Sequence, residues 1–401
     1  MRIAVIQSGN SGFFPRFYKS LKLSAEKSKD DLRLFCPNIG ANRRLQLVDQ
    51  INFGSKYNWF IHYHLYKFFG IQDVFSFFDT LDLIKKLKRF DPKVIHFHVV
   101  NAWIINFPLL INYINKNNIK VIWTMHDCRA FTGRCAYFDE VNCDRWKIGC
   151  GICPQKQLYW PTLIDSSALQ WNLRKAMFGK FRNLHIVTPS KWLADYVKES
   201  FFNKFPVKVI YNGLDLDRFK INNIPNTLLE FIPNDINVIL GVAANWEYRK
   251  GLDCFKKLAV DLPAYYRVVL VGGMNKDNVA CLPKQIIYYG KTSSFEEIVS
   301  LYQRASVFVN PTLADNFPTT NIEALASGTP VVTFVTGGSA ESIDEKTGIA
   351  VPQGDFDALK KAIVYVSSHR DDIFTRENCI KRSQSFSLKQ FDKYIDLYHK
   401  I

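Results

Sequence analysis

The sequence has no long uninterrupted hydrophobic run. Its most apolar stretch, residues 94–114, is interrupted by histidine, asparagine and proline, so it does not supply the roughly 20 consecutive apolar residues that a transmembrane helix needs. The first residues, MRIAVIQSGNSGFFP, contain one arginine and an apolar run that stops at serine and glycine, which is too short for a secretory signal. We therefore expect a buried strand at the start and a cytoplasmic protein.

Acidic residues are scarce in the first half. Residues 1–200 hold 29 Lys and Arg against 15 Asp and Glu, whereas residues 201–401 hold 23 against 22. A basic half can attract an anionic membrane surface or a phosphorylated acceptor, and it can equally be a solvated surface that keeps the protein soluble. The sequence lacks an RNA-binding signature, a zinc-finger pattern and a basic region with heptads, so nucleic acid is not an expected partner.

Residues 43–69 combine basic and aromatic side chains. The basic members are Arg43, Arg44, Lys56 and Lys67, and the aromatic members are Tyr57, Trp59, Phe60, Tyr63, Tyr66, Phe68 and Phe69. This mixture is typical of a segment that lies in a membrane interface, and stacking on single-stranded nucleic acid is the less favoured alternative. We expect peripheral contact with an anionic membrane at the inner face of the cell membrane.

Short apolar runs recur along the chain, and helix-like segments separate them. They lie at residues 3–7, 94–98, 120–125 and 184–188, and again at 238–243, 266–272, 286–289, 307–310 and 330–334. This alternation is typical of parallel sheets built from βαβ units. We expect an α/β fold of two doubly wound, Rossmann-like domains, residues 1–212 and 213–385, facing each other across a cleft, with a closing helix over residues 386–401.

The strongest functional signal is the segment PTLADNFPTTNIEALASGTPVV, residues 311–332. It places Asp315 and Glu323 on either side of a proline-containing turn, and Thr320 or Asn321 is expected to cap a helix that starts near Ile322. Carboxylates there can accept hydrogen bonds from the hydroxyls of a sugar and a ribose, and free N–H groups at a helix start bind phosphate. Complementation of the helix dipole would explain one carboxylate, but not the turn and the small residues.

This segment resembles the signature of the retaining glycosyltransferases of family 4, which have the GT-B fold. That signature is a Glu, seven residues, a second Glu and then Ala-x-Ala-x-Gly-x-Pro-Val. Glu323 and the residues after it match, whereas Asp315 stands where the family usually has Glu. The resemblance implies that Glu323 holds the ribose, that Asp315 reaches the donor sugar at the catalytic centre, and that the intervening backbone amides contact sugar and diphosphate, through Asn316, Phe317, Pro318, Thr319 and Thr320.

Family members also carry an Arg and a Lys-Gly pair in one loop, and these bind the diphosphate. In GVAANWEYRKGLDCF, Lys250 matches the pair, but the usual Arg position near Ala244 or Asn245 holds no Arg, and Arg249 is the candidate substitute. Solvated charges at the start of a helix are the weaker interpretation, because cations are unfavourable there. The expected role is to stabilise the charge of the departing diphosphate. Lys250 and a helix N-terminus can replace a divalent ion, so we expect catalysis to need no cofactor.

In the first half, His126 follows a strand in WTMHD and matches the His-Asp of the family, in which the His lies beside the reacting sugar carbon. We expect it to act by polar contact and proton handling, with a hydrogen-bonded structural histidine as the alternative. His96 and His98 stay open between the two roles. Gly9 and Gly12, in the turn after the first strand, are expected to let the backbone approach the donor phosphates, although no full Gly-x-Gly-x-x-Gly is present.

Residues 128–153 form an insert, CRAFTGRCAYFDEVNCDRWKIGCGIC, that holds five of the nine cysteines. The spacing of Cys135, Cys143, Cys150 and Cys153 suits one structural Zn²⁺, which would order a hydrophilic excursion with little core of its own. Disulfides are the alternative, and a reducing cytosol disfavours them. The insert is similar to one in a cysteine-bearing subgroup of these transferases from polysaccharide gene clusters, and we expect it to shape access for the acceptor.

Three functional interpretations follow. The first is a retaining transferase that moves a sugar from a nucleotide diphosphate sugar, of the UDP or GDP type, to a lipid-linked or saccharide acceptor in exopolysaccharide, capsule or lipopolysaccharide biosynthesis. The second is a nucleotide-sugar epimerase of the same fold, which the acidic motif and the Lys-Gly loop disfavour. The third is a non-catalytic protein that binds sugar nucleotides, which is compatible with Asp315 and the missing Arg.

Overall fold

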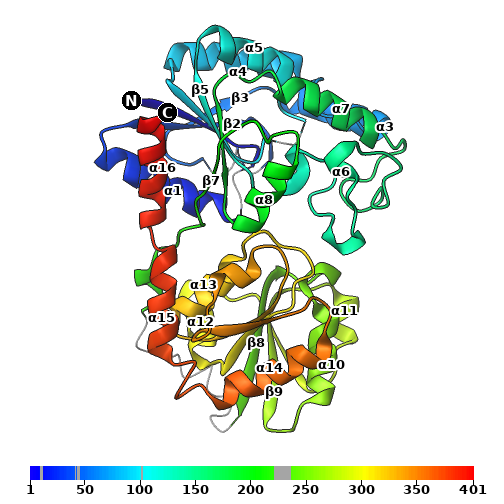
Figure 1. The fold of residues 1–401 in the computed structure, drawn as a ribbon, viewed down its shortest axis with the longest axis vertical. Coiled ribbons are helices and arrows are strands. Elements are labelled where there is room, and N and C mark those ends of the chain that lie inside the picture. Colours follow the sequence, from blue (N-terminus) through cyan, green and yellow to red (C-terminus); the bar gives the residue numbers. More distant parts are fainter. Residues whose placement is uncertain (10–11, 41, 43–45, 101–102, 221–235) are drawn as a thin grey trace. The chain divides into compact units, whose positions relative to one another are not determined.

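The structure is a computed structural model that describes residues 1–401 except 10–11, 41, 43–45, 101–102 and 221–235. It divides into two compact units (Figure 1). The first unit comprises Met1–Tyr211 and Gln390–Ile401, and the second comprises Asn212–Lys389. Arg43 and Arg44, from the basic and aromatic segment, lie outside the described residues.

The first unit contains a seven-stranded parallel sheet in the order β3-β2-β1-β4-β5-β6-β7. Its strands are β1 (Arg2–Ile6), β2 (Asp31–Pro37), β3 (Gln50–Phe53), β4 (Val94–Phe97), β5 (Lys120–Thr124), β6 (Leu184–Thr188) and β7 (Val207–Val209). Four of them, β1, β4, β5 and β6, lie where apolar runs predicted strands. β2 was not predicted, because its sequence DLRLFCP mixes charged residues with apolar ones.

Helices cover this sheet and enclose one large buried hydrophobic cluster. They are α1 (Phe14–Lys27), α3 (Lys56–Phe69), α4 (Phe77–Phe90), α5 (Phe107–Lys116), α6 (Arg145–Ile148), α7 (Ser167–Phe178), α8 (Lys191–Glu199) and α16 (Lys389–Lys400). Local capping sets the bounds of α3: the Ser55 side chain accepts a hydrogen bond from the Tyr57 N–H, and Gly70 ends the helix at φ 66°. α16 occupies most of the segment expected to form a closing helix.

The second unit contains a six-stranded parallel sheet in the order β10-β9-β8-β11-β12-β13. Its strands are β8 (Asn237–Asn245), β9 (Tyr266–Gly273), β10 (Ile286–Gly290), β11 (Val307–Asn310), β12 (Val331–Phe334) and β13 (Gly348–Val351). Its helices are α10 (Leu252–Asp261), α11 (Lys276–Ala280), α12 (Phe295–Arg304), α13 (Thr319–Ala326), α14 (Phe356–Ser368) and α15 (Arg376–Ser383). Buried clusters lie on both faces of the sheet, as expected for strands that read as continuous apolar runs.

Both sheets reverse their strand order once. In the first unit the order reverses between β1 and β4, and in the second unit it reverses between β8 and β11. In open parallel sheets, ligands bind beyond the carboxyl ends of the strands at such a reversal. Functional residues are therefore expected in the segments that follow these four strands.

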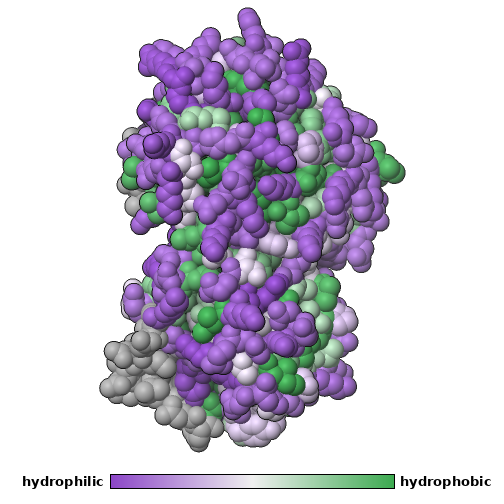
Figure 2. All heavy atoms as spheres, turned by 60° about the vertical axis from the view of Figure 1, so that its left-hand side comes forward, coloured by the Kyte–Doolittle hydropathy of each residue, from purple (hydrophilic) through white to green (hydrophobic). Residues whose placement is uncertain are grey.

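The surface of the molecule is mixed in polarity. Hydrophilic side chains cover most of the face drawn in Figure 2, and the hydrophobic ones on it form smaller separate groups. In the part of the chain that the structure describes, every helix is too short or too polar to cross a bilayer.

Candidate functional site

In the second unit, an ion pair joins the segments that follow β8 and β11. The Lys250 Nζ lies 2.6 Å from Asp315 Oδ2, and both side chains are about four-fifths buried. Lys250 ends a short 3-10 turn, Tyr248–Lys250, and the next residue, Gly251, has φ 74°. A Cβ at Gly251 would lie 2.3 Å from the carbonyl oxygen of Pro311, so only glycine lets the two segments approach this closely.

Arg249 binds the same loop from the side of β8. Its guanidinium donates a hydrogen bond to the carbonyl of Ala314. Its own carbonyl accepts from the Leu313 N–H at 2.8 Å and from the Thr312 hydroxyl at 3.2 Å. Arg249 therefore holds the loop that carries Asp315, while Lys250 contacts the carboxylate itself.

A glycine pair supports Asp315 from behind. Gly337 has φ 55°, and a Cβ there would lie 1.6 Å from the carbonyl oxygen of Asp315. The next residue, Gly338, donates its N–H to the carbonyl of Asn316 at 2.7 Å. The turn after β12 thus determines the course of the backbone at residues 315–316.

Helix α13 starts earlier than the sequence predicted from the candidate capping residues. It begins at Thr319, and its N-cap is Pro318. The expectation that Thr320 or Asn321 caps a helix near Ile322 is wrong, because the Asn321 amide is engaged inside the fold: its Oδ1 accepts from Asn310 at 2.8 Å and its Nδ2 donates to Ser342 Oγ at 3.0 Å. Since Pro318 has no N–H, the expected backbone N–H contacts to a ligand reduce to those of Asn316, Phe317, Thr319 and Thr320.

Glu323 lies one helical turn after the start of α13. Its carboxylate accepts a hydrogen bond from the Tyr302 hydroxyl at 3.1 Å. Burial and the neighbouring carboxylate raise the pKa of Tyr302 well above its usual value, so the phenol stays neutral and can donate. This contact fixes the side chain of Glu323 near the middle of the helix.

The side chains of Asn316 and Phe317 are buried. The Phe317 ring packs against Phe386 with the ring centres 5.5 Å apart. Their side chains are structural here, so any contact of these two residues with a donor would come from the backbone.

Sequence reasoning missed a cavity of about 510 Å³ at the ends of β8, β9 and β10. Its volume is in the range typical of small-ligand pockets. The two glycines that end β9 were a sequence signal for this cavity, because glycine permits a close approach of backbone segments. A Cβ at Gly272 would lie 1.6 Å from the carbonyl oxygen of Ala243. The cavity is lined by Asn245, Trp246, Gly273, Met274, Asn275, Tyr288 and Lys291.

In the first unit, three histidines form a row at the ends of β4 and β5. His98 Nδ1 and His126 Nε2 lie 3.0 Å apart and share a hydrogen bond. His96 is held by the Tyr398 hydroxyl at 2.6 Å and the Thr124 hydroxyl at 2.8 Å. His96 is fully buried and its two ring nitrogens are satisfied, which is typical of a structural histidine.

Burial keeps these histidines neutral. It lowers the pKa of His126 to about 4 and that of His96 to about 3, and it holds the pKa of His98 well below its usual value. Asp127, next in sequence, opposes the effect on His126. Its carboxylate pairs with Arg129, at 2.9 Å to Nε and 2.5 Å to a terminal guanidinium nitrogen. A neutral imidazole at this strand end can donate or accept a hydrogen bond near neutral pH.

Gly9 and Gly12 lie in the turn after β1, on either side of residues outside the described part of the chain. A Cβ at either position would meet no atom within 4 Å, and Gly12 has φ 65°. The turn is anchored to β4 by the Ser8 N–H, which donates to Val99 at 2.7 Å. The ends of β1, β4 and β5 thus bring this turn, His98 and His126 to one edge of the sheet.

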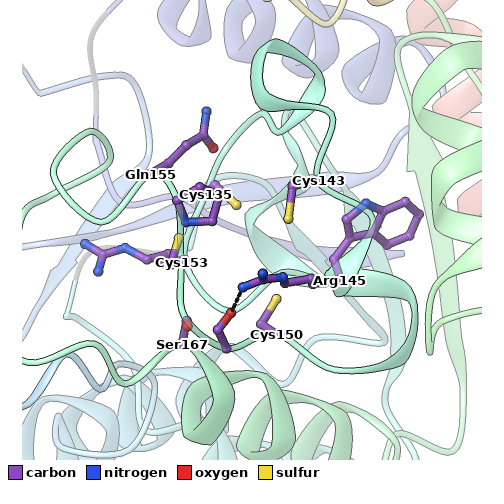
Figure 3. A pocket seen from close by; sticks show the side chains of 11 residues that line it. Cys135, Cys143, Arg145, Cys150, Cys153, Gln155 and Ser167 are labelled. Atoms are coloured by element: carbon purple, nitrogen blue, oxygen red, sulfur yellow. Dashed lines mark hydrogen bonds between the residues drawn. The ribbon is translucent and has the colours of Figure 1, made fainter.

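The insert places its cysteines around one pocket (Figure 3). Cys135, Cys143, Cys150 and Cys153 all line a cavity of about 20 Å³, and all nine cysteines of the chain are free thiols. A hydrogen bond from Cys135 lowers the pKa of Cys153 to about 7. Among the described residues, no three Cys, His, Asp or Glu side chains are arranged so that they could hold a metal ion together.

Two family profiles match the chain. The profile described as Glycosyltransferase Family 4 matches residues 21–218, and the one described as Glycosyl transferases group 1 matches residues 236–369. Among curated proteins, the chain is similar to WcaC of Escherichia coli K12, described as a colanic acid biosynthesis glycosyl transferase. The two are 24% identical over 299 residues, which span 72% of this chain and 71% of that relative.

Solved structures share the fold. A sucrose-phosphate synthase from Thermosynechococcus elongatus superposes with a TM-score of 0.72 at 15% identity, covering 100% of this chain and 98% of that one. HepE of Anabaena in complex with UDP gives a TM-score of 0.70 at 14% identity, covering 99% and 98%. Both units match family profiles, each contains a parallel sheet, and Glu323 of the acidic motif lies on α13. The chain therefore belongs to the retaining glycosyltransferases of family 4, group 1, and has the GT-B fold.

Proposed function

We propose that this protein transfers a sugar from a nucleoside diphosphate sugar, of the UDP or GDP type, to a lipid-linked or saccharide acceptor in cell-surface polysaccharide biosynthesis. The observation that carries the donor assignment is the convergence of Lys250, Asp315 and the start of α13 at the β8/β11 reversal. The polysaccharide context is supported by the similarity to WcaC, which is named for colanic acid biosynthesis.

The diphosphate would bind to the ammonium of Lys250 and to the N–H groups of Thr319 and Thr320. Breaking the bond to the anomeric carbon leaves negative charge on the departing diphosphate, and a cation and a helix N-terminus both stabilise that charge. Lys250 is held by Asp315, so it is in position before the donor arrives. In this proposal catalysis needs no divalent ion.

The two carboxylates have separate roles. Asp315 accepts a hydrogen bond from a hydroxyl of the donor sugar, with a side chain one methylene shorter than the Glu that the family usually has. Glu323, fixed by Tyr302, accepts from the ribose hydroxyls. The 510 Å³ cavity follows β8 and β9 directly, and we assign it to the base, with Trp246 and Tyr288 as the apolar contacts and Asn245 and Asn275 as the polar ones.

The first unit supplies the acceptor side. His126 is neutral because of its burial, so it contributes a polar contact or accepts a proton rather than providing a fixed charge. A Cβ at Gly9 or at Gly12 would meet no atom within 4 Å, which suits a backbone contact to substrate at these two residues. The cysteine insert follows His126 in the chain and is assigned to acceptor access.

Contact with an anionic membrane is supported by one face of α3. Tyr57, Phe60, Ile61 and Phe68 are 54–69% exposed and recur at helical spacing, which puts them on one stripe. Lys56 and Lys67 lie near the ends of the same helix. An exposed aromatic stripe between cationic ends suits the interface of an anionic bilayer, so we place the protein at the inner face of the cell membrane.

Nucleotide binding tests the donor site. Thermal unfolding is measured with UDP, GDP, CMP and their sugar conjugates, since a ligand that binds only the folded state raises the Tm. We expect one nucleoside diphosphate to raise the Tm of the wild type, to raise it less in Tyr302→Phe, which keeps the carboxylate but removes the hydroxyl that holds it, and to lose most of its effect in Glu323→Gln. A protein that melts cooperatively and responds to none of them would favour a non-catalytic protein.

Product analysis distinguishes the enzyme classes. With acceptor present, we expect release of the free nucleoside diphosphate and transfer of the sugar with retained anomeric configuration. Formation of a free epimerised nucleotide sugar without any acceptor would instead support an epimerase of the same fold.

A further inference from the structure

The later part of the insert and the residues after it, 141–166, have few buried side chains, whereas residues 128–140 pack into the core of the first unit through Phe131, Cys135 and Phe138. Between residues 141 and 166 the regular structure is the single short helix α6, and the buried residues there are Trp146, Gln155 and Thr162. Ile148 and Ile152 are 89% and 87% exposed. A segment with so small a core needs a cross-link or a metal to become ordered.

Three thiols from this segment and the thiol of Cys135, which precedes it, line one pocket. Figure 3 shows the sulfur atoms of Cys135, Cys143, Cys150 and Cys153 around a single pocket. Its volume of about 20 Å³ is close to what one water molecule or one ion requires. Because the four residues come from different turns of the insert, one group bound by all of them would tie those turns together.

Burial raises the pKa of Cys150 to about 11, and a hydrogen bond to Cys153 together with burial raises the pKa of Cys135, so these thiols would lose their protons only on binding a metal ion. Donors and cations at the pocket would stabilise the thiolates that form. The Gly133 N–H donates to Cys150 Sγ at 3.2 Å, and the Gln155 N–H donates to the sulfur of Cys153. Two arginines, Arg134 and Arg145, also line the pocket. Arg145 is held there by the carbonyls of Gly151 and Ile152, both at 2.6 Å. A divalent ion with four thiolates keeps two negative charges, which two guanidinium groups can balance.

We propose that Cys135, Cys143, Cys150 and Cys153 bind one Zn²⁺ as a structural site that orders the insert. On binding, each thiol gives its proton to water and each sulfur forms one bond to the metal, so the four coordination positions are filled and none is open to substrate. Because the thiols do not yet have ligand geometry, metal binding must draw them toward a common centre.

The site would also stabilise the contact between α3 and the segment that follows the insert. That segment is attached to the end of the helix by the Tyr66 hydroxyl, which donates to the Trp160 carbonyl at 2.7 Å, and by the Leu163 N–H, which donates to the Lys67 carbonyl at 3.0 Å. Cys153 is tied to the same stretch through its N–H, which donates to Asp165 at 2.6 Å. Loss of the metal should therefore loosen residues 141–166 first.

Metal content tests the proposal on the full chain, purified under reducing conditions without chelator. We expect about one equivalent of Zn²⁺, strongly reduced in Cys143→Ser and in Cys150→Ser. Cys254→Ser and Cys281→Ser, in the second unit, are the matched controls and should keep the metal. In the wild type, removal of Zn²⁺ by a chelator should speed tryptic cleavage at Lys147 and Lys156, and added Zn²⁺ should reverse the effect.

Cobalt provides a readout that does not depend on the variants folding. Co²⁺ added to the reduced, metal-free wild type should produce a thiolate charge-transfer band and the visible bands of a tetrahedral site. Less than about a tenth of an equivalent of Zn²⁺ together with no such bands would overturn the proposal. A Cys135–Cys153 disulfide in protein isolated under reducing conditions would overturn it as well, in favour of a redox pair.

Discussion

The ammonium of Lys250 lies 2.6 Å from a carboxylate oxygen of Asp315, 65 residues further along the chain. This ion pair joins the segments that follow the two strands at the order reversal of the second sheet. It presents a cation at the edge of the sheet where a diphosphate is proposed to bind.

Removing the charge of Lys250 should reduce transfer much more than stability. For Lys250→Gln we expect kcat/KM to fall by about 10²–10³, the usual cost of losing one group that stabilises charge in the transition state. The Tm should fall much less than the activity, because the substituted amide can still donate a hydrogen bond to the Asp315 carboxylate. Lys220→Gln, which breaks the exposed Lys220–Asp217 pair of the same unit, is the control. Equal activity of the two variants would contradict the assignment.

Gly337 should be intolerant of a side chain. In Gly337→Ala the new Cβ meets the Asp315 carbonyl at 1.6 Å, so the loop that carries Asp315 must move, and we expect a lower Tm and loss of donor binding. Gly354→Ala is the matched control, because Gly354 also has a left-handed φ, 81°, but open space around it. Gly354→Ala should lower the free energy of unfolding only by the about 1–2 kcal/mol that a left-handed backbone costs a residue with a side chain. Donor titration and thermal unfolding measure both, and equal effects would contradict the close approach.

The buried histidines should make the first unit sensitive to acid. An unfolded histidine takes up a proton near pH 6.5, whereas burial lowers the pKa of folded His126 to about 4. The unfolded state therefore binds more protons between these values, so the contribution to the free energy of unfolding is complete above pH 6.5 and is lost as the pH falls toward 4.

Between pH 7 and pH 4.5, we expect the free energy of unfolding to fall by about 2 kcal/mol less in His126→Asn than in the wild type. Denaturant unfolding across this pH range measures the difference. His96, His98, Asp127 and Arg129 are the titratable groups near the ring in the described structure, and they remain in the variant. His64→Asn on the exposed face of α3 is the control and should leave the slope as it is. A wild-type stability independent of pH in this range would contradict the prediction.

The exposed face of α3 should bind anionic membranes. We expect the wild type to co-sediment with vesicles that contain phosphatidylglycerol and not with neutral ones, and salt should weaken the binding. Phe60→Ser with Phe68→Ser should reduce binding at least about tenfold, because each buried aromatic side chain contributes roughly 1.5–3 kcal/mol. Tyr265→Ser, which changes an exposed aromatic residue of the second unit, should have no effect. Failure of the wild type to bind anionic vesicles at any salt concentration would refute the membrane assignment.

Much of the fold follows from local patterns in the sequence. The apolar runs at β1, β4, β5 and β6, and those of the second sheet at β8 to β12, predicted strands because a buried parallel strand needs apolar side chains on both faces. The family resemblance came from Glu323 and the small residues after it, which are contiguous in the chain. β2 and β3 were missed because each mixes polar or charged residues with apolar ones, DLRLFCP in β2 and QINF in β3.

The sequence by itself determined the family, the two parallel sheets and the residue types of the donor motif, because these depend on patterns within short segments. Only the tertiary structure decided which of those residues meet. The pairing of Lys250 with Asp315, the start of α13 at Thr319, the cavity beyond β8 to β10 and the pocket of four thiols each depend on which segments become neighbours. Hydrophobic periodicity carries no information on strand order, so contacts between distant segments appear only when the chain has folded.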